Sequence, residues 1–334
     1  MNPTYAIIGC GRIARRHAEQ MNKTGTLVAV CDIVPDNAAE LAREYGAKIY
    51  LTIEELLARE PSIDIVSICT PNGLHAVHSI LCLKAGKHVL CEKPLCISVA
   101  DAKAMVEAAN TYDRKLFVVK QNRYNPPVQM LKALLDDDKL GNIFSFQVNC
   151  FWNRPNEYYT DSWKGTKDMD GGTLFTQFSH FIDLLYWLLG DVKEVKAIVR
   201  NFEHPTNNID DSGVVIIEML GGAIGTINYT VNSFRKNMEG SFTVFGKNGT
   251  VKIGGQYLNT IEYQCIDGTE ISDLPHSRPA NAYGFYQGSM SNHDKVYENL
   301  IRALHEPGYE FASALDGLKT VEIIEKIYAH AAMK

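Results

Sequence analysis

The stretch TYAIIGCGRIA, residues 4–14, decides the fold of the first third of the chain. Its apolar residues Tyr5–Ile8 are typical of a buried strand, and a helical pattern follows the glycines. Gly9 permits a tight turn between the two, and Gly11 lets backbone N–H groups approach a pyrophosphate. Ala14, at the third small position, allows the helix to pack closely on the strand. The pattern predicts a dinucleotide-binding turn, with the phosphates at the positive end of the helix dipole.

An acidic residue at the end of the next strand strengthens this prediction. The apolar run Leu27–Cys31 ends in Asp32, twenty-one residues after Gly11. A carboxylate there can accept hydrogen bonds from the ribose hydroxyls and would repel a 2′-phosphate. The residues that follow, Ile33–Pro35, offer no cation to hold such a phosphate. We therefore predict NAD as the cofactor, and Arg12 keeps NADP as the less favoured alternative.

Strands and helices keep alternating up to residue 120, which predicts a parallel sheet with right-handed crossovers. We expect strands at 48–50, 65–68, 88–91 and 116–120 and helices at 36–45, 53–59, 74–85 and 99–110. Ligands bind where such strands end, and three polar loops fall there. These loops are Thr70-Pro71-Asn72, Glu92-Lys93-Pro94 and Gln121-Asn122-Arg123.

The cofactor contacts are therefore expected from the glycine turn and from these loops. The residues predicted to bind the cofactor are Gly9, Gly11, Arg12, Ile13, Ala14, Asp32, Thr70, Pro71, Asn72, His75, Glu92, Lys93 and Gln121. Lys93 stands between a buried strand and a proline, so its backbone is held in place rather than free in a surface turn.

Composition places the chain among ordinary globular proteins. It has 334 residues, which favours two domains, with 46% hydrophobic and 22% charged residues. A net charge of −6 and the lack of a Lys/Arg block argue against a nucleic-acid partner. The eight cysteines form no C-x-x-C pair, so we expect reduced, buried thiols and no structural zinc or other metal site.

The ends and the apolar segments predict no membrane association. The first residues enter a strand at once, without the pattern of a signal peptide. The most apolar stretch, 181–189, is interrupted by Asp183 and is too short to span a bilayer. We expect a cytoplasmic protein that acts on a small molecule.

The pattern changes at Asn142, where strand-like runs follow one another with short turns. These runs are 143–152, 192–201, 214–219, 223–231, 241–245, 250–253 and 257–265. They predict one large, mostly antiparallel sheet flanked by helices, with oligomer contacts on one face. Helices are expected at 295–305 and 314–332. We predict a Rossmann domain at 1–122 and an α+β substrate-binding and oligomerisation domain at 123–334.

The run GGTLFTQFSHFIDLLYWLL, residues 171–189, is typical of a helix that is apolar except for one stripe. The polar stripe consists of Thr173, Thr176, Gln177, Ser179, His180 and Asp183. Solvent-facing stripes are built from Lys and Glu, and this stripe has neither. Hydroxyls, an amide, an imidazole and a carboxylate suit a partly dry cleft instead, so the stripe is the candidate for chemistry.

The glycine turn, the Glu92-Lys93-Pro94 loop and residues 171–183 with His180 together resemble the glucose–fructose oxidoreductase/inositol dehydrogenase family, called Gfo/Idh/MocA. The resemblance covers the whole chain, in order. It implies a Rossmann domain joined to an α+β domain, and the oxidation or reduction of sugar carbinols with NAD(P). It further implies that Lys93 and His180 lie at the nicotinamide end of the cleft, and that the protein is a homo-oligomer, a tetramer or a dimer.

One residue departs from the family pattern. Many members carry Asp four residues before the histidine, where this chain has Thr176. Segments 151–159 and 163–166 are similar to the branch of UDP-N-acetylglucosaminuronate 3-dehydrogenases, whose members have Asn or Thr in place of that Asp. This narrower resemblance implies a 3-keto nucleotide sugar, made for a later aminotransferase in surface-polysaccharide biosynthesis.

Oxidation of a secondary alcohol requires a base for the O–H proton, and the cofactor accepts the hydride. We assign His180 as the base, because an ordinary histidine pKa of about 6.5 lies near the working pH, with a satisfied core histidine as the alternative. Lys93 would hydrogen-bond the reacting oxygen. The predicted substrate-binding residues are Lys93, Arg123, Arg154, Tyr158, Tyr159, Lys164, Thr176, Gln177 and His180.

Several of these residues have a structural alternative. Arg154, Arg123 and Lys164 would bind a carboxylate or diphosphate, or form surface ion pairs. Tyr158 and Tyr159 would stack on a uracil, or pack in the core.

The segment 283–293 caps a helix, or places Tyr286, Asn292 or His293 at the mouth of the substrate site. Two rival functions remain for the chain as a whole. It would be a dehydrogenase of inositol or a free hexose, or a non-catalytic NAD-binding sensor.

Overall fold

The structure is a computed structural model that describes residues 2–277, 279–282, 284, 286–306, 308–309 and 311–332. The chain folds into two compact units. The first comprises Met1–Val119 and His293–Val321, and the second comprises Lys120–Asn292 and Glu322–Lys334. The segment His293–Val321 therefore belongs to the N-terminal unit, whereas the sequence suggested a single boundary after residue 122. The functional division at that boundary stays a prediction.

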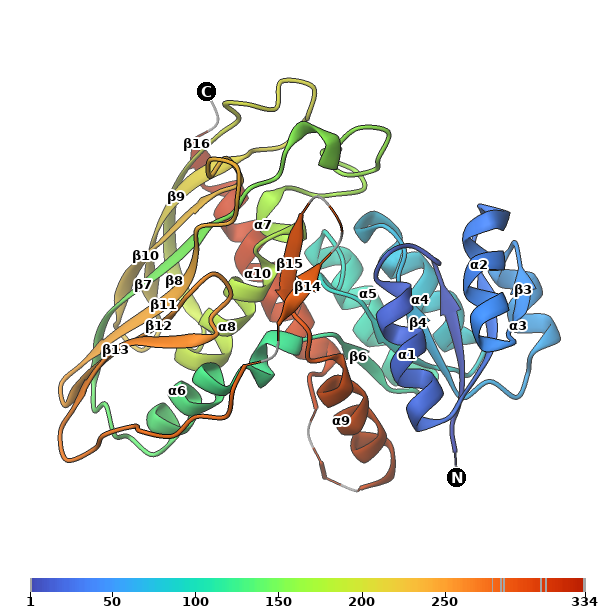
Figure 1. Ribbon diagram of the computed structural model, residues 1–334, viewed down its shortest axis with the longest axis horizontal. Coiled ribbons are helices and arrows are strands. Elements are labelled where there is room, and N and C mark those ends of the chain that lie inside the picture. The colour runs from blue at the N-terminus through green and yellow to red at the C-terminus, as the bar shows by residue number, and fades with distance from the viewer. Residues whose placement is uncertain are drawn as a thin grey trace. The chain divides into compact units, whose positions relative to one another are not determined.

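The first unit is built on a six-stranded parallel sheet with the order β3-β2-β1-β4-β5-β6 (Figure 1). Its strands are β1 Thr4–Ile8, β2 Thr26–Cys31, β3 Lys48–Tyr50, β4 Ile65–Ile68, β5 His88–Cys91 and β6 Leu116–Val118. Its helices are α1 Ala14–Thr24, η1 Asn72–Leu74, α2 Pro35–Tyr45, α3 Ile53–Arg59, α4 His75–Lys84, α5 Val99–Thr111 and α9 His293–His305. The predicted Rossmann sheet is confirmed, and the strand order reverses between β1 and β4, where such sheets bind ligands.

Local sequence explains why these elements begin where they do. The strands β4 and β5 are apolar runs that are buried along nearly their whole length, as the strands of a covered parallel sheet must be. The Thr52 side chain accepts a hydrogen bond from Glu55 N at the start of α3, and Ser98 accepts one from Asp101 N at the start of α5. These caps satisfy backbone N–H groups that have no partner inside the helix.

The second unit is built on an eight-stranded sheet with the order β13-β12-β11-β7-β10-β9-β8-β16. Its strands are β7 Ile143–Phe151, β8 Val192–Arg200, β9 Ser212–Met219, β10 Ile224–Thr230, β11 Glu239–Gly246, β12 Gly249–Gly254, β13 Thr260–Ile266 and β16 Ala331–Ala332. Neighbouring strands are antiparallel except for the pairs β7–β10 and β8–β16. The predicted mostly antiparallel sheet is confirmed.

The C-terminal end of the chain corrects one expectation. The helix predicted at 314–332 ends earlier, because α10 runs over Ala314–Ala329 and the next residues form β16 beside β8. A two-stranded hairpin of β14 Ala280–Ala282 and β15 Gln287–Met290, which the sequence did not predict, completes the strands of this unit in the described part of the chain. Short edge strands of this kind carry too few residues to show a period of two.

Helices cover one face of the eight-stranded sheet (Figure 1). The remaining helices of this unit are η2 Gln121–Tyr124, α6 Pro126–Asp136, η3 Asn156–Tyr158, α7 Thr173–Thr176 and α8 Ser179–Leu189. The Phe178 ring packs against Tyr229 of β10 at 5.8 Å and against Trp152 at 5.3 Å between centroids. These aromatic contacts fix the start of α8 on the sheet.

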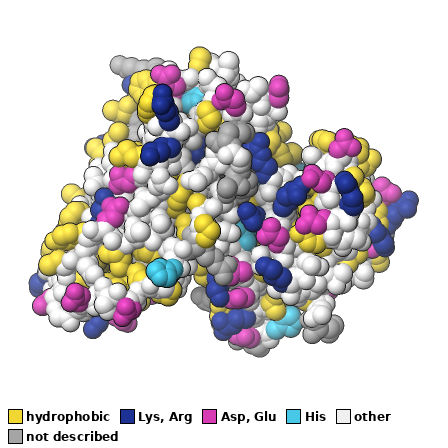
Figure 2. All heavy atoms as spheres, viewed as in Figure 1, with side chains coloured by type: hydrophobic (Ala, Val, Ile, Leu, Met, Phe, Trp, Pro, Cys, Tyr) yellow, Lys and Arg dark blue, Asp and Glu magenta, His cyan; other side chains and the backbone are white. Residues whose placement is uncertain are grey.

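The opposite face of this sheet exposes apolar side chains. Ile198, Val214, Ile216, Ile224 and Phe245 are each between 41% and 59% exposed. Figure 2 shows hydrophobic side chains gathered along the left edge of the molecule, over this sheet. A patch of this kind suits the predicted oligomer contact, which remains a prediction.

The eight cysteines are free thiols, and six of them are buried. Among the described residues, no helix is both long and apolar enough to cross a membrane.

Candidate functional site

The glycine turn between β1 and α1 places different demands on its two glycines. Gly9 has a φ of +90°, and a Cβ on it would lie 2.7 Å from the backbone carbon of Cys69. By contrast, a Cβ on Gly11 would meet no atom within 4 Å. Gly9 is therefore required by the protein itself, whereas Gly11 borders open space, and the phosphate position beside it stays a prediction.

Asp32 ties this turn to the end of β2. Its Oδ2 accepts a hydrogen bond from Cys10 N at 2.7 Å, and its Oδ1 accepts one from Val34 N at 2.8 Å. The carboxylate thus holds the backbone of the glycine turn and remains half-buried beside it. An acceptor group fixed at this point fits the ribose hydroxyls of NAD, and this role of Asp32 stays a prediction.

Two of the predicted polar loops are connected by His75. Its Nδ1 lies 2.7 Å from Pro94 O, and its Nε2 lies 2.8 Å from Thr70 O. The buried imidazole therefore fixes the loop after β4 to the loop after β5. Asn72 is also buried, while Thr70 and Pro71 keep part of their surface exposed.

Glu92, next to Lys93, is the centre of a buried polar network that the sequence did not reveal. Its Oε1 lies 2.8 Å from His17 Nε2, and its Oε2 accepts a hydrogen bond from Lys93 N at 3.1 Å. Burial alone would raise the pKa of Glu92, but the hydrogen bond from His17 holds it well below its usual range. Tyr297 OH lies 2.8 Å from His17 Nδ1 and 3.0 Å from Ser67 Oγ. The network holds the Lys93 backbone beside an ionised carboxylate.

A second imidazole, that of His293, approaches this carboxylate. His293 Nε2 lies 3.5 Å from Glu92 Oε1, and both ring nitrogens of His293 are buried without a hydrogen-bond partner. The ligating atoms of His17, Glu92 and His293 lie within 4.8 Å of one another, which is close enough for a metal ion. His17 shares a hydrogen bond of 2.8 Å with the Glu92 carboxylate, whereas His293 reaches the same carboxylate only at ion-pair distance.

In the second unit, the expected single helix over 171–189 is in fact two helices. α7 ends at Thr176 and α8 begins at Ser179, with Gln177 and Phe178 between them. Phe178 N donates to Thr173 O, one residue further back than in an α-helix, and Phe181 N donates to Phe178 O, one residue nearer. Because the hydrogen-bond register changes here, the polar residues from Thr173 to Asp183 do not form one continuous stripe on a single regular helix, as was predicted.

The threonines of α7 are held by two buried carboxyl-bearing residues. Thr176 Oγ1 donates to Asp170 Oδ1 at 2.5 Å, and Thr173 Oγ1 donates to Asp210 O at 2.5 Å. Burial raises the pKa of Asp170 to about 6 and also raises that of Asp210. His180, on α8, is 4% exposed.

Gln177 connects the predicted substrate residues Arg154 and Tyr158. Arg154 Nε donates to Gln177 Oε1 at 2.7 Å, and Gln177 Nε2 donates to Tyr158 OH at 2.7 Å. Arg154 Nη1 donates to the Asn153 carbonyl at 2.6 Å and to Asn237 Oδ1 at 3.3 Å.

The guanidinium of Arg154 also lies over the rings of Trp152, Tyr158 and Tyr286, each at 5.1–5.4 Å. Arg154 is 2% exposed, so it does not form the surface ion pair that was its alternative.

Arg123 is also buried, and its partner is Asp183. Arg123 Nε donates to Asp183 Oδ2 at 2.9 Å, and Arg123 Nη2 donates to Asp183 Oδ1 at 2.7 Å. Lys120 Nζ adds a third contact to Oδ1 at 3.0 Å. Burial raises the pKa of Asp183, but Arg123 and Lys120 outweigh it and bring it to about 2. The surface ion pair considered for Arg123 is therefore corrected to a buried one.

The structure also describes contacts of Tyr159, Lys164, Gln121 and Asn292, which belong to the second unit. Tyr159 packs edge-on against Tyr158 at 5.0 Å, and Lys164 Nζ lies 4.9 Å from the Tyr158 ring centroid. Gln121 Nε2 donates to Ser289 Oγ at 3.0 Å. Asn292 Nδ2 donates to Gln121 O at 3.2 Å, so Asn292 is buried inside this unit. The Tyr283 and Phe285 positions of the segment 283–293 lie outside the described residues.

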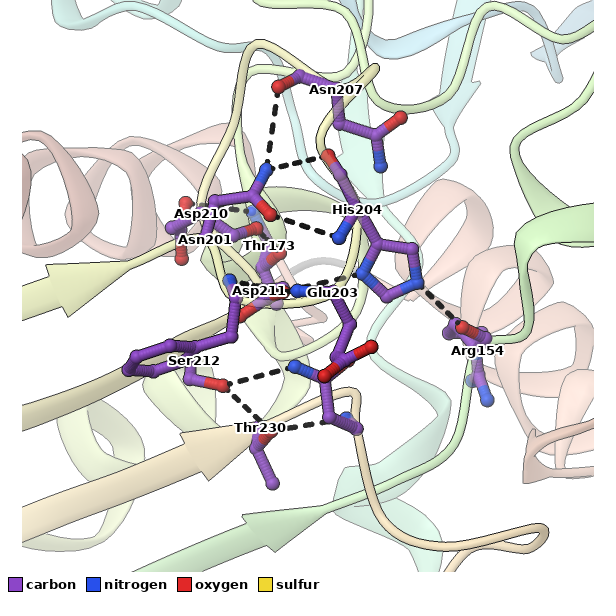
Figure 3. A network of polar contacts seen from close by, with 12 residues as sticks. Arg154, Thr173, Asn201, Glu203, His204, Asn207, Asp210, Asp211, Ser212 and Thr230 are labelled. Atoms are coloured by element: carbon purple, nitrogen blue, oxygen red, sulfur yellow. Dashed lines mark hydrogen bonds and ion pairs between the residues drawn. The ribbon is translucent and has the colours of Figure 1, made fainter.

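The loop between β8 and β9 forms a second polar network that sequence reasoning missed (Figure 3). Asp211 Oδ2 accepts hydrogen bonds from Phe202 N and Glu203 N, both at 2.8 Å, and lies 3.3 Å from His204 Nδ1. His204 Nε2 lies 3.0 Å from Arg154 O, so the network reaches the backbone of the buried arginine. No periodicity or residue spacing in the sequence predicts contacts of this kind.

The comparisons with known proteins agree with this architecture. Residues 4–120 match the family model for the NAD-binding Rossmann fold of the GFO/IDH/MocA oxidoreductase family, and residues 128–252 match the family's C-terminal domain. The chain therefore belongs to the Gfo/Idh/MocA oxidoreductase family. It carries the family's NAD-binding fold.

Solved structures of WlbA dehydrogenases from two organisms are similar over nearly the whole chain. One is the WlbA dehydrogenase from Chromobacterium violaceum in complex with NADH and UDP-GlcNAcA. It is 33% identical, with a TM-score of 0.90, and the match covers 98% of this chain and 93% of the WlbA chain. The WlbA dehydrogenase from Bordetella pertussis, in complex with the same two compounds, has a TM-score of 0.90 at 32% identity, with coverages of 99% and 96%. Levoglucosan dehydrogenase of Pseudarthrobacter phenanthrenivorans is 27% identical over 91% of this chain and 87% of its own length.

Proposed function

We propose that this protein is an NAD-dependent dehydrogenase that oxidises the 3-hydroxyl group of UDP-N-acetylglucosaminuronate, in the biosynthesis of a nucleotide sugar for surface polysaccharides. The buried guanidinium of Arg154 is the observation that carries the proposal. The similarity of the whole chain to two WlbA dehydrogenases, whose structures were solved with NADH and UDP-GlcNAcA, supports the proposal independently.

Arg154 is a buried cation whose partners are neutral. In the described part of the chain, Nε and Nη1 donate to amide and carbonyl oxygens, and the surrounding groups are aromatic rings. Burial lowers the pKa of Arg154, because the charged form loses its hydration. A buried charge without a counter-ion is costly, and a sugar carboxylate would supply the missing anion in a two-pronged geometry.

The catalytic roles follow from the chemistry of a secondary alcohol. NAD, when bound, supplies the hydride acceptor. We assign proton removal from the sugar hydroxyl to His180 and stabilisation of the developing negative charge to Lys93. Glu92 and His17 hold the Lys93 backbone. Replacing His180 by Asn should depress turnover with little loss of NAD binding, and unchanged turnover would disprove this role.

The alternative substrates are inositols and free hexoses, since myo-inositol 2-dehydrogenase of Thermotoga maritima is 29% identical over 73% of this chain and 73% of its own length. Such neutral substrates leave the charge of Arg154 without an anion, which is why we favour the uronate. A non-catalytic NAD-binding sensor would bind NAD but transfer no hydride.

The test is a comparison of substrates that differ by one carboxylate. Purified protein with NAD is incubated with UDP-N-acetylglucosaminuronate, UDP-N-acetylglucosamine, myo-inositol and glucose, and NADH formation is followed by absorbance. We expect NADH only with the uronate. NADH formation with inositol or glucose instead would contradict the proposal, and so would its absence with all four.

A matched pair of variants tests the role of the buried arginine. Arg154→Gln should raise KM for the uronate about 10- to 100-fold, the loss expected for a charge-assisted hydrogen bond. Arg302→Gln removes an arginine whose side chain is 51% exposed and paired with Glu306, and it should leave KM unchanged. Equal changes of KM in the two variants would show that Arg154 does not bind the substrate.

A further inference from the structure

A buried carboxylate lies behind the threonine that departs from the family pattern. Thr176 Oγ1 donates to Asp170 Oδ1 at 2.5 Å and lies 3.2 Å from Asp170 O. Asp170 is 1% exposed and Thr176 is 8% exposed. The two residues are six apart, so the sequence does not place them at one helical spacing, and their contact depends on the turn before α7.

Backbone groups hold the Asp170 carboxylate in this position. Its Oδ2 accepts a hydrogen bond from Gly165 N at 2.9 Å, and its Oδ1 accepts one from Gly172 N at 3.3 Å. An ionised carboxylate can only accept hydrogen bonds. Because both of its oxygens are fixed by donors, the carboxylate keeps its orientation toward Thr176.

The contact determines how the threonine can bind a further group. A hydroxyl group has one hydrogen to donate and two lone pairs that accept. Asp170 takes the single hydrogen of Thr176, so any further hydrogen bond of the Thr176 oxygen must be one that it accepts. The neighbouring residue, Gln177, is oriented in a similar manner by Arg154 and Tyr158.

We propose that Asp170 is a positioning residue for the reaction proposed above: it holds the hydroxyl hydrogen of Thr176, so that Thr176 Oγ1 accepts a hydrogen bond from a hydroxyl group of the sugar. Asp170 thus supplies, through Thr176, part of what a carboxylate at position 176 would supply directly. This inference rests on the proposed function.

The charge of Asp170 controls the direction of this hydrogen bond. Burial raises the pKa of Asp170 to about 6, so the carboxylate is ionised at neutral pH and takes up a proton in mild acid. The protonated form can donate to Thr176, which reverses the bond. Among the described residues, the titratable groups that face Asp170 include Asp210, Tyr158, Tyr159 and Tyr328.

Among these facing groups the phenols stay neutral, because burial raises their pKa values above the usual range. The Asp210 carboxyl accepts from Tyr229 OH at 2.5 Å and Tyr328 OH at 2.8 Å instead of from Thr176.

The test measures kcat/KM against pH for the wild type and three variants, on the sugar that the wild type oxidises. Asp170→Asn and Thr176→Val should each lower kcat/KM about 10- to 100-fold above pH 7, and the double variant should fall no further. In the plot of kcat/KM against pH, the acid limb of Asp170→Asn should also lack the one-proton ionisation near pH 6 that the wild type shows. Thr176→Ser, which keeps the hydroxyl, should stay close to the wild type.

Controls separate positioning from folding. Asp210→Asn removes a buried carboxylate that is not bonded to Thr176 and should keep the acid limb. Affinity for NAD and the melting temperature report whether each variant is folded. An unchanged acid limb in Asp170→Asn, or losses that multiply in the double variant, would overturn the inference.

A substrate-independent measurement distinguishes failure of this inference from failure of the proposed function. The infrared carbonyl band of a protonated carboxyl should appear in the wild type below pH 6 and be missing in Asp170→Asn. In Thr176→Val its midpoint should move to higher pH, because the ionised form loses a hydrogen bond. No hydride transfer with any sugar would refute the proposed function alone, whereas an unmoved midpoint would refute the coupling of Asp170 to Thr176.

Discussion

The buried ion cluster around Asp183 makes a sharp prediction about stability. Asp183→Asn keeps the size of the side chain and removes its charge. The side chains of Asp183 and Lys120 are each 2% exposed and that of Arg123 is 10% exposed, so the substitution removes the negative charge that both buried cations contact. Breaking a buried pair in this manner typically costs about 3–5 kcal/mol.

The pKa of Asp183 gives a second measure of the same effect. The pKa is lowered from 3.8 to about 2, which corresponds to about 2.5 kcal/mol of stability at neutral pH. Because the folded pKa is depressed, this stability is present above pH 4 and is lost as the pH falls toward 2. The difference between the wild type and Asp183→Asn should therefore shrink in acid.

Tryptophan fluorescence is a suitable assay, since Trp152, Trp163 and Trp187 all belong to the second unit. At pH 7, Asp183→Asn should lower the melting temperature of this unit by roughly 6–20 °C. The matched control is Glu218→Gln, which breaks a pair with Lys193 whose side chains are 35% and 56% exposed and should cost less than about 1 kcal/mol. Similar melting temperatures for the two variants would refute the reasoning.

The glycine turn and Asp170 give further predictions. Gly9→Ala should destabilise the first unit by about 2–4 kcal/mol, since its Cβ would lie 2.7 Å from backbone at a φ of +90°. Gly11→Ala should melt like the wild type and weaken NAD binding in a calorimetric titration; equal NAD affinity would contradict a phosphate position beside it. Asp170 has a raised pKa, so its stabilising contribution is full below pH 4 and about 3 kcal/mol is lost as the pH rises through 6. Asp170→Asn should remove that part of the dependence of melting temperature on pH, and an unaltered dependence would contradict it.

The sequence predicted the fold where the signal is local. The turn of Gly9 and Gly11, the buried strands and Asp32 follow one another within thirty residues, and each carries its own pattern of polarity or backbone freedom. Seven of the eight strands of the second sheet, all but β16, were predicted by the same alternation, with their ends shifted by at most three residues.

The candidate site was less predictable, because its support comes from distant or irregular contacts. The network around Glu92 joins His17 to Tyr297, which is 280 residues away along the chain. The break between α7 and α8 depends on hydrogen bonds of altered register, which an apolar period of 3.6 does not reveal. Asp170 precedes two glycines without any helical or strand pattern, so its contact with Thr176 required the folded turn.

The central claim is the transfer of hydride from a uronate sugar to NAD, and one labelling measurement tests it directly. UDP-N-acetylglucosaminuronate carrying deuterium at C3 is incubated with the protein and NAD, and the NADH formed is analysed by mass spectrometry. The account predicts NADH that contains one deuterium, together with a 3-keto sugar product. Unlabelled NADH from the deuterated uronate would contradict the account. So would the absence of NADH with the uronate under conditions in which the protein oxidises an inositol.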